Sequence, residues 1–192
     1  MKLYIKNMVC NRCILVVQNE LLKIGIQPVH VALGEVELKE EYLDKKTLDQ
    51  LDAALKLLGF ERIDDRKARL IEKTKNIIIQ IIHHSDQIDL HLNWSEFLSR
   101  ELHYEYNYLS SLFSSLEGIT LEQYIIRQKI ERVKELLLYN ELTLNEIAYK
   151  LGYSSVQHLS GQFKKITGFT PSVLKKSRQL DQNRKPIDAV ND

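Results

Sequence analysis

Two cysteines near the start of the chain, Cys10 and Cys13, are the only thiols in the sequence, and they lie three residues apart. Two thiolates at this spacing can bind one soft metal ion, and they suit Cu(I) better than a tetrahedral Zn(II) site, which needs two further ligands. The same spacing serves thiol–disulfide chemistry. Cysteine is also among the most frequently buried residues, so the pair could serve packing alone. The sequence leaves these three interpretations open.

A second group of functional side chains lies near the C-terminal end. Leu159 and Phe163 belong to an apolar stripe that predicts a helix with a polar opposite face. Amide, hydroxyl and imidazole groups can hydrogen-bond to base edges in a DNA major groove, and lysines can bind phosphates. The same helix could also be an ordinary part of a helical bundle. The residues expected to contact DNA here are Lys150, Ser155, Gln157, His158, Ser160, Gly161, Lys164 and Lys165.

A shorter helix precedes this one, and the two have the pattern of a helix-turn-helix. Thr143 and Glu146 have the spacing of a capping box, which predicts that the first helix begins there. Gly152 suits the turn that ends it, and Ser154 or Ser155 is expected to cap the second helix. In a helix-turn-helix, this second helix enters the major groove.

The helix pair occurs twice in this part of the chain. A shift of fifty residues aligns Glu96 with Glu146, Leu109 with Leu159, Phe113 with Phe163, Gly118 with Gly168 and Thr120 with Thr170. A long helix near residues 120–138, with a basic stretch, is expected to join the two copies. This duplication at a fixed offset favours DNA binding over a simple bundle.

The segment LTLNEIAYKLGYSSVQHLSGQFKKITGFTPSVLKK resembles the signature of the AraC-family transcription regulators, and YIIRQKIERVKELL resembles their linking helix. The resemblance covers about residues 68–178. It implies two helix-turn-helix units on a rigid linker helix, which read successive major-groove segments of double-stranded DNA. The base-reading positions of the family fall on Asn107, Ser110 and Ser111 in the first unit and on Gln157, His158 and Gly161 in the second.

The first unit departs from the family pattern. His103 stands where the family usually has glycine, Glu105 stands at a cap that is usually serine, and the helix EYNYLSSLFSSLE contains no lysine or arginine. An exposed carboxylate near phosphates repels them, by about 1 kcal/mol or less. We therefore expect this unit to bind DNA weakly, or to read bases through Tyr106, Asn107 and Tyr108. Salt-dependent affinity should come mainly from the second unit and the linker helix.

The first 65 residues are expected to form a separate domain that positions the cysteines. KLYIKN alternates apolar and polar residues, PVHVALGEVELK is typical of two short strands around Leu33 and Gly34, and FERID is a last short strand. Helices are expected over CILVVQNELLKIG and over a segment that Thr47 caps. The order is β-α-β-β-α-β, a ferredoxin-like pattern. It places Cys10 and Cys13 after the first strand, where a helix N-terminus favours the thiolate.

This domain resembles the heavy-metal-associated domain of copper chaperones and copper ATPases, which carries Met-x-Cys-x-x-Cys in the same loop. Here the motif is Met8, Cys10 and Cys13, and Asn7 replaces the usual glycine before the methionine. The resemblance covers about residues 1–65. It implies a sensor in which Cu(I) or another soft metal ion, or the thiol state, alters the attached DNA-binding domain.

Composition and charge narrow the functional classes. Only seven glycines and three prolines occur, which argues against an all-β sandwich or barrel. Residues 127–178 carry ten Lys and Arg against four Asp and Glu, whereas residues 1–65 carry nine against eleven, so two modules with different partners are expected. The sequence contains no run of about 18 apolar residues, so no membrane helix is expected. The expected location is cytoplasmic. No catalytic triad or phosphate loop is present, so an enzyme is not expected.

We therefore predict an α+β protein with a ferredoxin-like sensor domain at residues 1–65, an AraC-type DNA-binding domain at 66–178 and a disordered tail at 179–192. The expected function is sequence-specific transcription regulation, with double-stranded DNA and RNA polymerase as partners and a monomeric or homodimeric state. The alternative is a thiol redox or metal-carrier protein fused to a DNA-anchoring module.

Overall fold

The computed structural model describes residues 1–90 and 92–176, which divide into two compact units, Met1–Asn76 and the part from Ile77 onward. The domain limit predicted after residue 65 coincides with the start of helix α3 (Arg66–His84), and the division between the units falls within this helix. The tail predicted at 179–192 lies outside the described residues. None of the helices described is long and apolar enough to cross a bilayer.

The N-terminal unit has the predicted β-α-β-β-α-β order. Its elements are β1 (Lys2–Lys6), α1 (Asn11–Lys23), β2 (Pro28–Ala32), β3 (Glu35–Leu38), α2 (Lys45–Leu57) and β4 (Glu61–Arg62). The strands form one sheet in the order β2-β3-β1-β4, and each neighbouring pair is antiparallel. The two short strands predicted around Leu33 and Gly34 are confirmed, and β2 and β3 form a hairpin across this turn.

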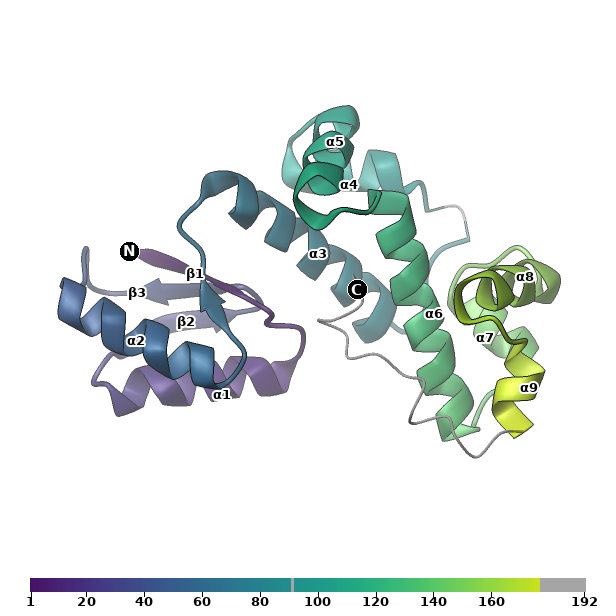
Figure 1. The fold of residues 1–192 in the computed structure, drawn as a ribbon, viewed down its shortest axis with the longest axis horizontal. Helices are drawn as coiled ribbons and strands as arrows, with labels where there is room; N and C mark the ends of the chain where they lie inside the picture. Colours follow the sequence, from purple (N-terminus) through teal and green to yellow (C-terminus); the bar gives the residue numbers. More distant parts are fainter. Residues whose placement is uncertain (91, 177–192) are drawn as a thin grey trace. The chain divides into compact units, whose positions relative to one another are not determined.

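Alternation along the strands and the helical periodicity together build one core. In β1, Leu3 and Ile5 are buried, and side chains of alternate residues point to the same face of a strand. Figure 1 shows α1 and α2 side by side along the sheet. The core they close contains Leu3, Ile5, Met8, Val17, Leu21, Ile26, Val36, Leu38, Leu51, Leu55 and Phe60.

The start of α2 differs from the prediction. Asp44, not Thr47, is the N-terminal cap, and its carboxylate accepts a hydrogen bond from the backbone N–H of Thr47 at 2.9 Å. An aspartate three residues earlier can satisfy the same free N–H groups of the first turn. The prediction that Thr47 caps the helix was therefore wrong, and the helix begins at Lys45.

The second unit repeats its helices at the predicted offset. The elements after α3 are α4 (Trp94–Leu102), α5 (Tyr106–Glu117), α6 (Leu121–Tyr139), α7 (Leu144–Lys150), α8 (Val156–Thr167) and α9 (Pro171–Lys176). The starts of α7, α8 and α9 follow those of α4, α5 and α6 by fifty residues. The aligned apolar residues of α5 and α8, Leu109, Phe113, Leu159 and Phe163, are completely buried.

Candidate nucleic-acid interface

The second helix-turn-helix, formed by α7 and α8, has the predicted local signals. Thr143 and Glu146 form a capping box at the start of α7. Hydrogen bonds donated by the hydroxyl and backbone N–H of Thr143 lower the pKa of Glu146. Ser155 caps α8 by accepting the backbone N–H of His158 at 3.1 Å. These caps fix where each helix begins.

The groove-reading face predicted for α8 is a solvent-facing surface. Leu159 and Phe163 are buried beneath it. Among the predicted DNA contacts, Gln157, His158, Gly161, Lys164 and Lys165 are exposed, and Ser155 and Ser160 are partly exposed. The structure therefore brings amide, imidazole, hydroxyl and ammonium groups together on one helix face, which is the mixture used for base and phosphate contacts.

Lys150 contacts Asp86, a neighbour that the sequence analysis did not predict. Its ammonium group donates a hydrogen bond to the backbone carbonyl of Asp86, and its own carbonyl accepts the N–H of Ile88 at 2.8 Å. The segment after α3 that contains Asp86 and Ile88, called the connector below, thus lies against the end of α7. Lys150 retains further N–H donors, so its role as a phosphate ligand stays a prediction.

Gly152 is required at this contact. It has a φ of +66°, and a Cβ there would lie 3.3 Å from the carbonyl oxygens of Ile88 and Asp89. A left-handed conformation and a close backbone approach both favour glycine. The predicted turn glycine therefore also makes room for the connector.

His158 is held at the start of α8 by the turn before it. Its ring packs edge-on against Tyr153, with centroids 5.4 Å apart, and its Nδ1 lies 3.2 Å from Oγ of Ser154. Tyr153 is buried, which raises its pKa, and its hydroxyl lies 3.0 Å from Oε1 of Gln162. Lys129 of α6 places its Nζ 5.1 Å from the centre of the same ring, and burial lowers the pKa of Lys129 to about 8.

The first helix-turn-helix, formed by α4 and α5, shows the expected departures. Asn93 caps α4, accepting the N–H groups of Ser95 and Glu96. His103 adopts the left-handed conformation, with φ 58° and ψ 39°, at the turn where the family has glycine. Glu105 is the cap of α5 but accepts no hydrogen bond through its side chain. Its exposed carboxylate therefore lies at the helix start.

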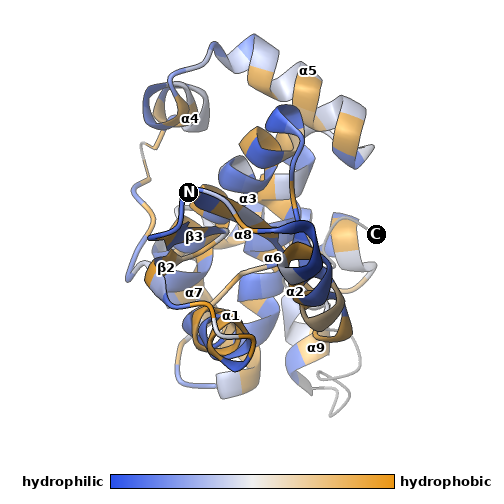
Figure 2. Ribbon diagram, turned by 90° about the vertical axis from the view of Figure 1, so that its left-hand side faces the viewer, coloured by the Kyte–Doolittle hydropathy of each residue, from blue (hydrophilic) through white to orange (hydrophobic). Residues whose placement is uncertain are grey.

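The outer face of α5 is uncharged. Asn107 and Ser111 are exposed and Ser110 is partly exposed. Tyr106 is partly buried, and burial followed by the charge of Glu122 raises its pKa. Figure 2 shows pale and orange bands along α5, as expected for a helix of serines, tyrosines and apolar residues.

Tyr108 is the most exposed tyrosine at the start of α5. It is 45% exposed, and its ring stacks on Tyr104 with centroids 5.6 Å apart and an interplanar angle of 21°. Sequence reasoning missed Tyr104. The signal that could have found it is the four-residue spacing of two aromatic residues at a helix start.

Charge divides unequally between the two units. Residues 94–117 contain one Lys or Arg against four Glu, whereas residues 144–167 contain three Lys against one Glu. The single basic residue of the first unit, Arg100, lies 3.4 Å from the carboxylate of Glu101. Positive charge is therefore concentrated in the second unit, which keeps the prediction that this unit supplies most of the salt-dependent affinity.

The linker helix α6 supplies less free positive charge than its sequence suggests. Lys134 is buried and pairs with Glu131 at 2.7 Å. Arg132 pairs with Glu135 at 2.6 Å, and Lys129 is partly buried near Tyr153. These three side chains therefore make contacts within the protein, and the contribution of the linker helix to salt-dependent DNA affinity stays a prediction.

The cysteine pair forms a separate candidate site in the N-terminal unit. The two Sγ atoms lie 3.5 Å apart at the start of α1, and both residues are partly exposed. Burial alone would raise the pKa of Cys10, but hydrogen bonds from Cys13 and Arg12 outweigh burial, so the pKa of Cys10 is lowered. The pKa of Cys13 is raised, mainly by burial. Within the described residues, no three His, Cys, Asp or Glu side chains gather as a metal site.

The loop before the cysteines explains why asparagine can replace glycine. Asn7 has a φ of 70°, a conformation that asparagine tolerates better than most residues. Its N–H donates to Glu72 and its side chain donates to the carbonyl of Gly59, both at 2.9 Å. Met8, part of the resembling motif, is fully buried, so its thioether belongs to the core.

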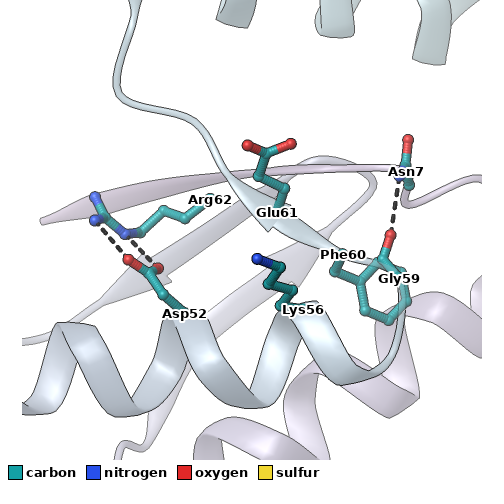
Figure 3. Close-up of a pocket in the computed structure, with 7 residues that line it drawn as sticks. All are labelled: Asn7, Asp52, Lys56, Gly59, Phe60, Glu61 and Arg62. Atoms are coloured by element: carbon teal, nitrogen blue, oxygen red, sulfur yellow. Dashed lines mark hydrogen bonds and ion pairs between the residues drawn. The ribbon is translucent and has the colours of Figure 1, made fainter.

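A cleft of about 450 Å³ lies beside this loop, between α2 and β4 (Figure 3). It is lined by Asn7, Asp52, Lys56, Gly59, Phe60, Glu61 and Arg62. Asp52 holds Arg62 through two hydrogen bonds at 2.9 and 3.0 Å. The charges of the cleft are mixed, so no ligand class follows from them.

Comparison with known proteins finds relatives of the helical unit. A family described as "Helix-turn-helix domain" matches residues 98–177. The HTH-type transcriptional regulator YtdP of Bacillus subtilis is 33% identical over 138 residues, which is 70% of this chain and 18% of YtdP. The F1 operon positive regulatory protein of Yersinia pestis is 35% identical over 107 residues, 53% of this chain and 33% of that protein. The chain thus spans a third or less of these relatives.

A solved structure is also similar to the helical unit. The C-terminal domain of AraT, a response regulator from Geobacillus stearothermophilus, aligns with a TM-score of 0.51 and 27% identity. The alignment covers 59% of this chain and 89% of that domain. Together with the duplicated helix pair and its linker, these matches show that the helical part of the chain is an AraC-family helix-turn-helix domain.

Proposed function

We propose that this protein is a sequence-specific DNA-binding transcription regulator. The observation that carries the proposal is the pair of helix-turn-helix units at a fifty-residue offset, with a polar, lysine-bearing outer face on α8. The regulators to which the chain is similar support the same function. RNA polymerase is the protein partner we propose, and the proposed state is a monomer or a homodimer.

Binding-site selection with the full chain tests this function. We expect enrichment of one motif that spans two neighbouring major-groove segments. The double variant Lys164→Ala, Lys165→Ala should weaken binding and reduce the slope of log affinity against log salt by about two. Lys45→Ala, Lys46→Ala in the N-terminal unit is the matched control. Failure to enrich any motif would contradict the proposal.

Recognition of particular bases by α8 has a separate test. Gln157 is exposed on the outer face, and its amide can pair with adenine in the major groove. Gln157→Ala should therefore change the selected sequence at one position while the salt slope stays the same. An identical motif for the variant would exclude this contact.

We further propose that a soft metal ion or the thiol state at Cys10 and Cys13 controls this regulator. The sulfurs lie 3.5 Å apart, within the limit of about 4.6 Å that lets two thiolates with roughly 2.3 Å bonds reach one ion. Among the described residues no third donor joins the pair, and two soft donors suit an ion of low coordination number, such as Cu(I), better than zinc. The residues therefore fit such an ion, with the hydrogen bonds to Cys10 favouring its thiolate.

A competition titration tests the metal proposal. Reduced protein would compete for Cu(I) with a coloured chelator, beside the double variant Cys10→Ser, Cys13→Ser. Tight one-to-one binding that the variant lacks supports the site. Equal, weak binding by both proteins would remove the metal interpretation and leave thiol oxidation as the form of control to test.

A further inference from the structure

We infer that Tyr108 is a base-reading, specificity-determining residue of the first helix-turn-helix unit and that Tyr104 positions it. The inference rests on the proposed DNA-binding function and deepens it. It assigns to the uncharged first unit a way of reading sequence without basic side chains.

The repeat places Tyr108 at the position of His158. The two residues are fifty positions apart, and each is the third residue of its helix, since α5 begins at Tyr106 and α8 at Val156. Both are exposed. His158 lies on the face of α8 that carries Gln157 and the lysines, so Tyr108 occupies the equivalent part of the outer face of α5.

Helix geometry supports this placement. Successive residues turn by about 100° around a helix axis. Asn107, Tyr108 and Ser111 therefore fall within about 100° of one another, opposite the buried Leu109 and Phe113. Among these three outward residues, Tyr108 has the largest side chain, so it reaches farthest toward a ligand that lies along α5.

Each of the two rings is held by the turn that precedes its helix. Tyr104 stacks on Tyr108 at 5.6 Å and 21°, and Tyr153 packs edge-on against His158 at 5.4 Å and 87°. In each unit a tyrosine of the preceding turn thus contacts the third residue of the helix, although Tyr104 and Tyr153 lie one position apart in the repeat. A ring that is already held in place loses less conformational entropy when it binds.

Tyrosine can read a base without a charge. Its ring can contact the methyl group of thymine, as apolar side chains do in the major groove, and its hydroxyl can donate to or accept from a base edge. The expected partner is a thymine-containing step in the segment of duplex DNA nearest α5. Such a contact contributes sequence preference but no counterion release, so it leaves the salt slope unchanged.

The test is binding-site selection with the full chain and two variants of each tyrosine. Tyr108→Ala should lose the preference at one or two base pairs of the part of the motif read by the first unit. Affinity for the wild-type site should fall about tenfold, as for the loss of one base contact, with the same salt slope and unchanged affinity for random DNA. Tyr108→His, which copies the second unit, should shift the preferred base.

The variants of Tyr104 separate positioning from folding. Tyr104→Phe keeps the stacked ring and should keep the wild-type motif, whereas Tyr104→Ala should weaken the same base preference that Tyr108→Ala removes. Tyr42→Ala is the matched control, since Tyr42 is an exposed tyrosine of the N-terminal unit. Circular dichroism would verify that each variant is folded.

Three outcomes would overturn the inference. If Tyr108→Ala selects the wild-type motif with affinity within twofold, Tyr108 reads no base. If the wild-type chain selects no motif at all, the proposed function fails, and this inference fails with it. A motif confined to one major-groove segment, unchanged in every Tyr108 variant, would leave DNA binding intact and exclude only the tyrosine contact.

Discussion

Single side chains decide how strongly each helix-turn-helix unit attracts DNA. The caps of α5 and α8 are equivalent in the repeat, but one is Glu105 and the other is Ser155. Ser155 uses its hydroxyl to bind the first turn, whereas the carboxylate of Glu105 accepts no hydrogen bond there. A helix N-terminus that points at a phosphate would normally favour binding, and a free carboxylate in that place opposes it.

Replacing Glu105 by serine should therefore strengthen DNA binding. The variant removes one negative charge near the phosphates and supplies the hydroxyl cap of the second unit. We expect a gain of a few fold at low salt, below about 1 kcal/mol, that shrinks as salt screens the charge. Fluorescence anisotropy at several salt concentrations measures it, with Glu41→Ser as the control. Equal affinities at low salt would show that Glu105 lies away from the phosphates.

At the scale of elements, Gly152 in the turn between α7 and α8 lies directly against the backbone of the connector after α3. Gly152→Ala should destabilise the helical unit by about 1–2 kcal/mol, because alanine disfavours a φ of +66° and its Cβ crowds two carbonyls. Tryptophan fluorescence can follow unfolding of this unit, since Trp94 is the single tryptophan.

Gly161 provides a matched control in the neighbouring helix. A Cβ there meets nothing within 4 Å, and alanine is the better helix former by up to about 1 kcal/mol. Gly161→Ala should therefore leave stability unchanged or raise it. If Gly152→Ala were as stable as Gly161→Ala, the close contact with the connector would be disproved.

The contact between α6 and the second helix-turn-helix predicts a pH dependence. Burial lowers the pKa of Lys129 to about 8 from an ordinary 10.5. Between these values the unfolded chain holds a proton that the folded chain has released, so the contribution of Lys129 to stability rises with pH. At pH 7 the desolvation of the charged ammonium group lowers the free energy of unfolding. At pH 10 the folded protein holds Lys129 mostly uncharged, so most of this loss is gone.

Lys129→Met should remove this dependence. The variant should gain stability over the wild type at pH 7, and the gain should fall by on the order of 1–3 kcal/mol by pH 10. Urea unfolding at both pH values measures the difference, with the exposed Lys164→Met as control. A gain that does not change with pH would mean that Lys129 titrates as an ordinary lysine.

At the scale of the whole molecule, the proposed control requires a coupling between the thiol pair and DNA affinity. Loading Cys10 and Cys13 with Cu(I) should change the affinity for the selected site by about 5- to 150-fold, the usual range of such couplings. Anisotropy titrations of the loaded and reduced full chain measure it, and the double serine variant should show no change. A loaded protein with unaltered DNA affinity would mean that the thiol site does not control DNA binding.

Much of the architecture follows from local signals in the sequence. The β-α-β-β-α-β order, the two short strands around Leu33 and Gly34, the capping box at Thr143 and the fifty-residue repeat are all confirmed. These features depend on residues close together in the chain, where periodicity, turn chemistry and capping act directly. The exposed face of α8 follows for the same reason, because a helical period fixes which residues lie opposite Leu159 and Phe163.

Tertiary structure decided which charged and aromatic side chains remain available. From the sequence alone, Lys129 and Lys150 are ordinary basic residues, yet Lys129 lies over the ring of Tyr153 and Lys150 binds the backbone of Asp86. The burial of Met8 was likewise set by packing. The free energy of a long side chain depends on partners that folding brings near. The sequence by itself therefore determined the elements and their repeat, and only the fold determined which side chains are free to bind.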